Sequence, residues 1–313
     1  MKIFYTDHFN FPLPADHRFP IEKYSLLRQQ ILRDDIVDAI KFCAPRAATD
    51  REIVRAHSPA YLTRLQNGEM TRKEMRRIGF PWSAELVERA RRSAGATIET
   101  GLAAIKEKIA VSLSGGTHHA FRDRGEGYCL LNDSVIAARA LQSENTLKKI
   151  MIIDCDVHQG NGTAAILAND ATIFTFSIHG KNNFPSRKEK SDLDVALEDE
   201  IGDRVYLEAL EKGLIGALDI FEAEMVIYLA GADPYENDRF GRLGLSKAGL
   251  LERDRMVFRY CQKAAIPVAV TMAGGYAKNI QDSVDIHFQT VKQAVEWHQR
   301  RNLGLALEPK SSL

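Results

Sequence analysis

Two carboxylates and an imidazole alternate directly after an apolar run: Asp154, Asp156 and His158 follow residues 150–153. Side chains two residues apart on an extended segment point to the same side, so Asp156 and His158 can bind one metal ion together. A catalytic metal site combines three protein ligands with an open position. Asp233 ends a later apolar run and is the candidate for the third ligand.

The type of ligand indicates which metal this site would hold. Two aspartates and one histidine form an oxygen-rich set, for which Zn²⁺ is the leading candidate and Fe²⁺, Co²⁺ and Mn²⁺ are alternatives. A bound divalent ion lowers the pKa of its water towards ~7 and polarises a carbonyl oxygen. The motif alone therefore suggests hydrolysis.

Hydrolysis of an amide also requires a base near the water and a donor for the developing oxyanion. His118 and His119 follow two glycines and can carry the proton, because histidine titrates near neutral pH. Tyr276 follows another glycine pair and can donate its phenolic hydrogen bond to the tetrahedral intermediate. We interpret the isolated histidines as structural or exposed; they are His8, His17, His57, His287 and His298.

The elements that must position these side chains follow from the rhythm of the chain. After a short strand at residues 3–5, the first hundred residues carry mostly helical patterns. From residue 109 onwards, short apolar runs alternate with helical stretches, which is typical of βαβ units around a parallel sheet. The runs are 109–114, 149–154, 171–178, 224–230 and 266–273.

Each of these runs leads into polar or glycine-rich residues, among them His179 after the third run. Ligands of open α/β sheets bind beyond the carboxyl ends of the strands, so we expect these polar ends to share one rim. The predicted fold is a single α/β domain over residues 1–313 with a central parallel sheet flanked by helices.

Composition limits the classes of partner. Lysine plus arginine (42) equals aspartate plus glutamate (42), so no global basic field attracts nucleic acid or an anionic membrane. The basic cluster at residues 72–77 has Glu69 and Glu74 interleaved, which favours a solvated helix face over a nucleic-acid site. The four cysteines form no CxxC pair and no stretch of about 18 apolar residues exists, so we expect a soluble cytoplasmic protein. The oligomeric state stays open.

The motifs SGGTHHAFRDRGEGYCLLND, DCDVHQGNGT, FTFSIHG, GADP and AGGY resemble, in order and spacing, those of the zinc-dependent histone deacetylase superfamily. The resemblance implies the three-layer arginase-deacetylase fold and a zinc-dependent deacetylase or deacylase. It also implies individual roles. The metal ligands would be Asp156, His158 and Asp233, the catalytic histidines His118 and His119, and the residue that polarises the scissile carbonyl Tyr276.

Two further sites are implied by the same resemblance. Gly127, Tyr128 and Phe184 match the walls of a tunnel for an acyl-lysine side chain. Asp154 and Ser177, together with nearby main-chain carbonyls, match a structural potassium site. An acyl-lysine peptide or a small acylated amine is the expected partner.

One position departs from many members of the family. Asp154 matches the carboxylate partner of His118, whereas Asn161 stands where a carboxylate often backs His119. A carboxylate stabilises an imidazolium, but a neutral amide only orients the ring. We therefore predict that His119 is neutral and acts as the general base, and that His118 is more readily charged. Asn161 also places the chain closest to the class IV-like branch and its bacterial relatives.

Several alternatives stay open at this point. The substrate can be a protein acyl-lysine, an acetylated polyamine or another small amide of any acyl length, and a non-catalytic acyl-lysine binding protein is a further possibility. The acidic segment 189–203 would suit a cationic substrate, although a solvated acidic loop is favoured.

Two other enzyme classes fit less well. Residues 160–165 match the dinucleotide-binding pattern GxGxxA, but Asp154 and Asp156 would repel a pyrophosphate. An arginase-like pair of manganese ions would need a second carboxylate two residues after Asp233, where this chain has Tyr235. One metal ion is therefore favoured.

Overall fold

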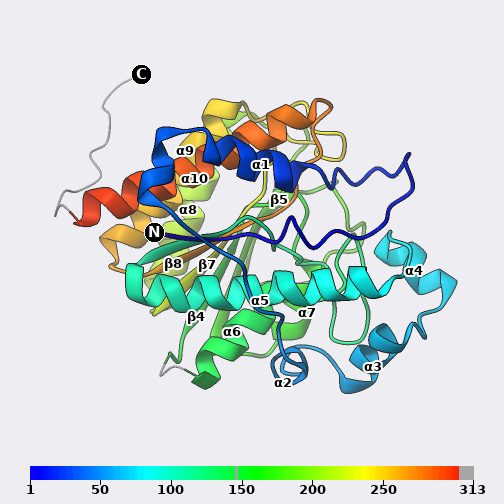
Figure 1. The fold of residues 1–313 in the computed structure, drawn as a ribbon. Coiled ribbons are helices and arrows are strands. Elements are labelled where there is room, and N and C mark those ends of the chain that lie inside the picture. Colours follow the sequence, from blue (N-terminus) through cyan, green and yellow to red (C-terminus); the bar gives the residue numbers. More distant parts are fainter. Residues whose placement is uncertain (145–146, 303–313) are drawn as a thin grey trace.

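The computed structural model describes residues 1–144 and 147–302 (Figure 1). Within them lies an eight-stranded sheet in the order β2-β1-β3-β8-β7-β4-β5-β6, and every neighbouring pair is parallel. The strands are β1 (Lys2–Phe4), β2 (Lys41–Cys43), β3 (Ile109–Ser112), β4 (Ile150–Asp154), β5 (Ile173–Gly180), β6 (Leu193–Leu197), β7 (Met225–Ala230) and β8 (Val268–Met272). The predicted α/β class with a central parallel sheet is confirmed.

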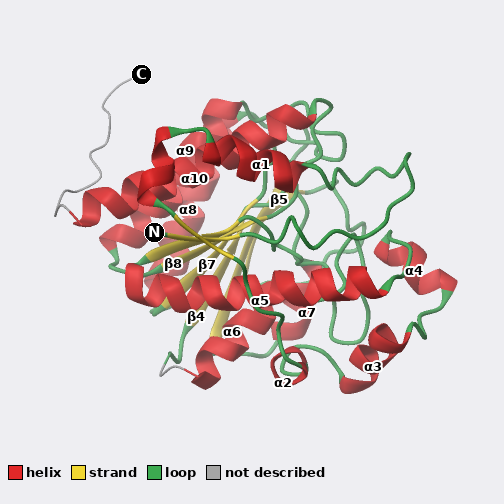
Figure 2. Ribbon diagram, in the orientation of Figure 1, coloured by secondary structure: helices red, strands yellow, loops and turns green. Residues whose placement is uncertain are grey.

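Helices cover both faces of this sheet (Figure 2). They are α1 (Lys23–Leu32), α2 (Asp50–Ile53), α3 (Pro59–Asn67), α4 (Arg72–Ile78), α5 (Ala84–Glu107), α6 (Asp133–Glu144), α7 (Asn161–Leu167), α8 (Asp203–Ile220), α9 (Lys247–Lys263) and α10 (Ile280–Asn302), with a short 3₁₀ helix at Asp35–Ala39. In Figure 1, α5, α6 and α7 lie on one face of the sheet and α1, α8, α9 and α10 on the other. No helix in the described ranges is both long and apolar enough to cross a bilayer.

The central strands show why their sequences read as unbroken apolar runs. All five residues of β4 are buried, because alternate side chains enter the two cores on opposite faces of the sheet. Met151 and Ile153 pack into the core beneath α8, α9 and α10, and Ile150 and Ile152 pack into the core beneath α5 and α6. The end of β4 is thereby fixed from both sides, which leaves its polar continuation at the edge of the sheet.

The segment 189–203 differs from the expected loop. Leu193–Leu197 forms the edge strand β6, which pairs in parallel with β5. The apolar signal of this strand is weak because no residue before Leu197 is fully buried. Its carboxylates are used locally: Asp192 accepts hydrogen bonds from Thr175, and Asp194 accepts one from Gln159.

Candidate active site

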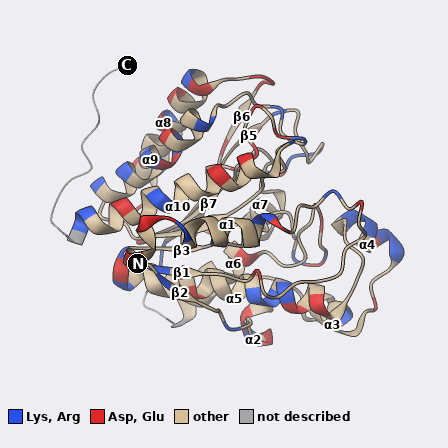
Figure 3. Ribbon diagram, turned by 45° about the horizontal axis from the view of Figure 1, so that its top comes forward, with Lys and Arg blue, Asp and Glu red and all other residues tan. Residues whose placement is uncertain are grey.

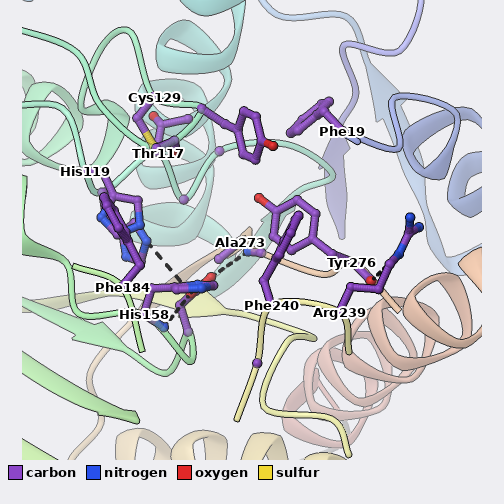
Figure 4. Close-up of a pocket in the computed structure, with 18 of the residues that line it drawn as sticks. Phe19, Thr117, His119, Cys129, His158, Phe184, Arg239, Phe240, Ala273 and Tyr276 are labelled. Atoms are coloured by element: carbon purple, nitrogen blue, oxygen red, sulfur yellow. Dashed lines mark hydrogen bonds and ion pairs between the residues drawn. The ribbon is translucent and has the colours of Figure 1, made fainter. Parts of the chain in front are cut away.

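The loops that follow β3, β4, β7 and β8 converge on one pocket of about 670 Å³ (Figure 4). These four strands are adjacent at the centre of the sheet, so their carboxyl ends meet at one rim, as predicted. The loop that follows β5 contributes Phe184 to the pocket, but the histidine near the end of this strand does not reach it. β5 continues through His179, whose Nδ1 lies 3.0 Å from Ser177 Oγ, and His179 is not among the residues that line the pocket.

Asp156, His158 and Asp233 come together at the pocket, where Asp156 and His158 belong to the lining and Asp233 lies beside them. Each is buried, and one potential ligand atom from each lies within 4.8 Å of the other two. His158 Nδ1 is 2.9 Å from Asp156 Oδ1 and 3.3 Å from Asp233 Oδ2. Asp233 Oδ2 is buried without a hydrogen-bond partner. A buried carboxylate oxygen left without a donor, beside a second carboxylate and an imidazole, fits a single divalent cation.

The remaining carboxylate oxygens of these ligands are held by backbone amides. Val157 N donates to Asp233 Oδ1 at 2.9 Å, and Gly274 N donates to Asp156 Oδ2 at 2.6 Å. A side chain at Gly274 would collide with both carboxylates, so the close approach of this loop requires glycine. The two aspartates are therefore oriented before any ion binds.

A fully buried arginine on α9 ties the two ligand loops together. Arg253 Nη1 donates to the carbonyl oxygens of Cys155, at 3.3 Å, and of Gly231. Cys155 precedes Asp156 in the chain, and Gly231 lies two residues before Asp233. The charge of Arg253 is matched by Asp254, which accepts from its Nε at 2.9 Å. Nothing in the sequence distinguished Arg253 from the other charged residues of its helix.

The charges at this centre strongly perturb one another. Burial and the charge of Asp156 raise the pKa of Asp233 to about 7. Burial alone would lower the pKa of His158, but its hydrogen bond to Asp156 and the nearby carboxylate of Asp233 raise it to about 10. Two buried carboxylates this close repel each other, and a bound cation would offset that repulsion.

His118 and His119 lie side by side above the ligands, with ring centroids 4.1 Å apart. His118 Nδ1 is 2.6 Å from Asp154 Oδ2, and His119 Nδ1 is 2.7 Å from Asn161 Oδ1. Burial alone would lower the pKa of His118, but Asp154 and Asp156 raise it to about 9. Burial and the charges of His118 and His158 lower the pKa of His119 well below its ordinary value. The structure thus pairs His118 with a carboxylate and His119 with an amide oxygen, and the division of roles expected from this difference stays a prediction.

Tyr276 projects its ring into the same pocket, with its hydroxyl directed towards the centre (Figure 4). Its backbone N–H donates to Asp238 Oδ2 at 2.6 Å, and its ring lies against Phe240 with centroids 5.0 Å apart. Burial, with Asp233 and Asp156 nearby, raises the pKa of Tyr276 well above its ordinary value. The phenol therefore stays protonated and can donate a hydrogen bond.

The three residues matched to a tunnel all line the pocket. Phe184 sets its ring edge-on to His119, with centroids 4.9 Å apart and an interplanar angle of 86°. Gly127 has a φ of 53°, and a side chain there would collide with His119. Tyr128 follows with a φ of 64°. Phe19, Tyr24 and Phe240 add to the aromatic lining. Phe19 and Phe240 come from irregular segments whose sequence carries no periodic signal.

The residues matched to a potassium site are neighbours in the sheet. Asp154 on β4 is the register partner of Ser177 on β5. The oxygens of Asp154 accept hydrogen bonds from Asp156 N, at 3.1 Å, and from His118. The structure thus brings Asp154 and Ser177 together, immediately beneath the histidine pair.

Comparisons with known proteins agree with this geometry. Residues 17–291 match the family model described as the histone deacetylase domain. An uncharacterized protein of Picosynechococcus is 42% identical over 276 residues, which cover 88% of this chain and 92% of that protein. Histone deacetylase 2 of Arabidopsis thaliana is 28% identical over 86% of this chain and 73% of its own length.

Two solved structures share the fold. The HD domain of HDA15 superposes with a TM-score of 0.78 at 19% identity, covering 97% of this chain and 96% of that one. A histone deacetylase homologue from Aquifex aeolicus gives a TM-score of 0.77 at 22% identity, covering 99% and 86% of the two chains. Together with the family match, these similarities show that the chain belongs to the histone deacetylase superfamily.

Proposed function

We propose that this protein is a metal-dependent amide hydrolase that removes an acetyl or longer acyl group from a lysine-like amine. The observation that carries the proposal is the gathering of three potential metal ligands, two histidines and one tyrosine around a single aromatic-lined pocket. Membership of the histone deacetylase family supports the same class of reaction. We further propose that residues 1–313 form one catalytic domain.

Asp156, His158 and Asp233 would hold the metal ion, most simply Zn²⁺, with Fe²⁺ and Co²⁺ as alternatives. When bound, such an ion acts as a Lewis acid on the scissile carbonyl and makes a water molecule acidic enough to attack near neutral pH. Asp233 Oδ2, which accepts from no backbone amide, is available to it, and Asp156 is held beside it by hydrogen bonds from the backbone N–H groups of His158 and Gly274. We propose a structural K⁺ at Asp154 and Ser177, which are register partners on the neighbouring strands β4 and β5.

The protein's own residues divide the remaining work. Neutral His119, oriented by Asn161, would take a proton from the attacking water and later deliver it to the leaving amine. His118, charged beside Asp154, would stabilise the negative charge that develops on the oxygens of the tetrahedral intermediate as water attacks the carbonyl. Tyr276 would donate its hydroxyl hydrogen bond to the carbonyl oxygen as it becomes an oxyanion. Phe184 and Tyr128 would exclude water around the acyl-lysine chain.

The experiment is hydrolysis of fluorogenic acyl-lysine peptides with acetyl and longer acyl groups, and of acetylated polyamines, by the purified protein. We expect release of amine that a chelator stops and added Zn²⁺ restores. Binding of the peptides without chelator-sensitive release would instead identify a non-catalytic acyl-lysine binding protein. Turnover of the polyamines alone would assign the chain to small-amide hydrolysis.

A further inference from the structure

The charged residues that line the pocket are unequal in sign. Four are cations, Lys23, Arg77, Arg239 and Arg242, while Asp156 is the one carboxylate among the described lining residues. Asp156 is already assigned to the metal ion at the bottom. The approach to the pocket is therefore positively charged, which is unfavourable for a polyamine or for a lysine-rich peptide.

The three arginines of this set lie exposed at the entrance, and we call them the mouth: Arg77, Arg239 and Arg242. Arg242 pairs with Asp199 at 3.2 Å. Arg77 and Arg239 form no ion pair with any carboxylate of the described residues. Their charges are therefore available to a ligand that enters the pocket.

Arg239 is held in position by the loop that carries the catalytic tyrosine. Its Nε donates to the carbonyl oxygen of Tyr276 at 3.1 Å, and its Nη2 donates to that of Ala277 at 3.3 Å. In Figure 4 it lies across the pocket from His119 and Phe184, beside the backbone of Tyr276. A cation anchored in this way loses little conformational entropy when it binds an anion.

Arg77 comes from a different part of the chain than Arg239 and lies in the last turn of α4. Its carbonyl oxygen accepts from Gly127 N at 3.1 Å, and that of Ile78 accepts from Tyr128 N at 2.6 Å, so the end of α4 is fixed to the tunnel wall. Positive charge continues along the helix through Arg72, Lys73 and Arg76 (Figure 3). Within the ranges that the structure describes, none of these three forms an ion pair, and Glu74 is taken by Arg64.

Resting on the proposed function, we propose that the substrate is an acylated lysine in an acidic peptide segment. The acyl-lysine chain enters the pocket while carboxylates flanking it meet Arg77 and Arg239. A peptide is favoured over a small molecule because the positive surface extends beyond the pocket along α4. The acidic segment 189–203 does not oppose this proposal, because none of its carboxylates lines the pocket. Three of them, Asp192, Asp194 and Asp199, are engaged by Thr175, Gln159 and Arg242.

The test compares three peptides of equal length in which the acyl-lysine is flanked by glutamate, glutamine or lysine. We expect kcat/KM to be roughly tenfold higher with glutamate than with lysine flanks, mainly through KM, and the ratio to shrink as salt is raised. Arg77→Glu and Arg239→Gln should each move the ratio towards one. Arg51→Gln, which removes an exposed charge on α2 outside the pocket lining, is the matched control and should leave the ratio unchanged.

Three results overturn the proposal: equal kcat/KM for all flanks, a preference for lysine flanks, or single-stranded nucleic acid competing at lower concentration than the acidic peptide. Loss of the Tyr276 anchor in Arg239→Gln would slow all three peptides alike, so the ratio separates charge recognition from damage to the site. If none of the peptides is hydrolysed, the proposed function fails instead, which a rate measurement distinguishes from hydrolysis without charge preference.

Discussion

The floor and the mouth of the pocket use charge in opposite ways. The floor, Asp156, His158 and Asp233, is buried, and backbone amides orient its carboxylates. At the mouth, Arg77 and Arg239 are exposed and meet no carboxylate of the described chain. Electrostatic interactions are strong and geometrically fixed where water is excluded, and weak and screened where it is not. We therefore propose that the chemistry takes place at the floor and that the mouth selects the substrate.

The largest expected effect separates the two histidines above the floor. His119→Ala should lower kcat by about 10³-fold, because it removes the neutral base, and should be more damaging than His118→Ala. Single-turnover rates at saturating substrate measure both. The reverse order of damage would assign the base to His118 and make Asn161 irrelevant to the division of roles.

Tyr276→Phe tests the phenolic hydrogen-bond donor of the pocket, whose backbone carbonyl also holds Arg239 of the mouth. Loss of one oxyanion donor should lower kcat by roughly 10²-fold while KM changes little. The ring and its contact with Phe240 are kept, so the fold is preserved. An unchanged kcat would remove Tyr276 from the mechanism.

Arg253→Lys tests whether the buried Arg253 positions the loops that carry the metal ligands Asp156 and Asp233. Lysine keeps a positive charge beside Asp254 but loses the guanidinium that bridges Cys155 and Gly231. The affinity for the divalent ion, measured by competition with a chelator, should fall by roughly tenfold, as is typical for groups that orient metal ligands. Arg255→Lys is the control, because Arg255 is a partly exposed arginine of the same helix whose Nε donates to Gln293 and not to a ligand loop. Equal metal affinity in both variants would show that Arg253 serves only stability.

The smallest effect concerns stability rather than turnover. His57 is buried behind the histidine loop, with Nδ1 2.8 Å from Phe121 O and Nε2 accepting from Asn132 N at 2.9 Å. Burial lowers the pKa of His57 from 6.5 to about 4. A lowered pKa stabilises the fold fully above pH 6.5, and this contribution is lost as the pH falls towards 4, by about 3 kcal/mol.

Thermal unfolding between pH 4 and 7 measures this loss. His57→Gln, whose amide can both donate and accept, should flatten the pH dependence, whereas the exposed His8→Gln should not. An unaltered slope in His57→Gln would assign the acid sensitivity to other groups. The structural reading of His57 from the sequence is in keeping with its two backbone partners.

The floor was more predictable from sequence than the mouth, for a physical reason. A buried parallel strand such as β4 reads as an unbroken apolar run, and the residues that follow it must lie at the ligand-binding edge. Asp156 and His158 could therefore be placed before any coordinates. Arg253 could not, because its partners are carbonyl oxygens about a hundred and about twenty residues away.

The arginines of the mouth could not be predicted from the sequence either, because their meeting also depends on long-range contacts. Arg77 lies in the last turn of α4, whose sequence is typical of a solvated helix face, and Arg239 lies in an irregular loop. Only the tertiary fold brings both to one pocket. The edge strand β6 was read as a loop because its residues alternate between partly buried and exposed. Weakly buried edges and long-range contacts carry little local signal.

The most direct measurement is the metal content of the purified protein and of Asp233→Ala, with hydrolysis recorded on the same samples. We predict one divalent ion per chain in the unaltered protein, and loss of both the ion and the activity in the variant. Two manganese ions per chain, or full activity in a metal-free sample, would contradict a single catalytic ion held by Asp156, His158 and Asp233.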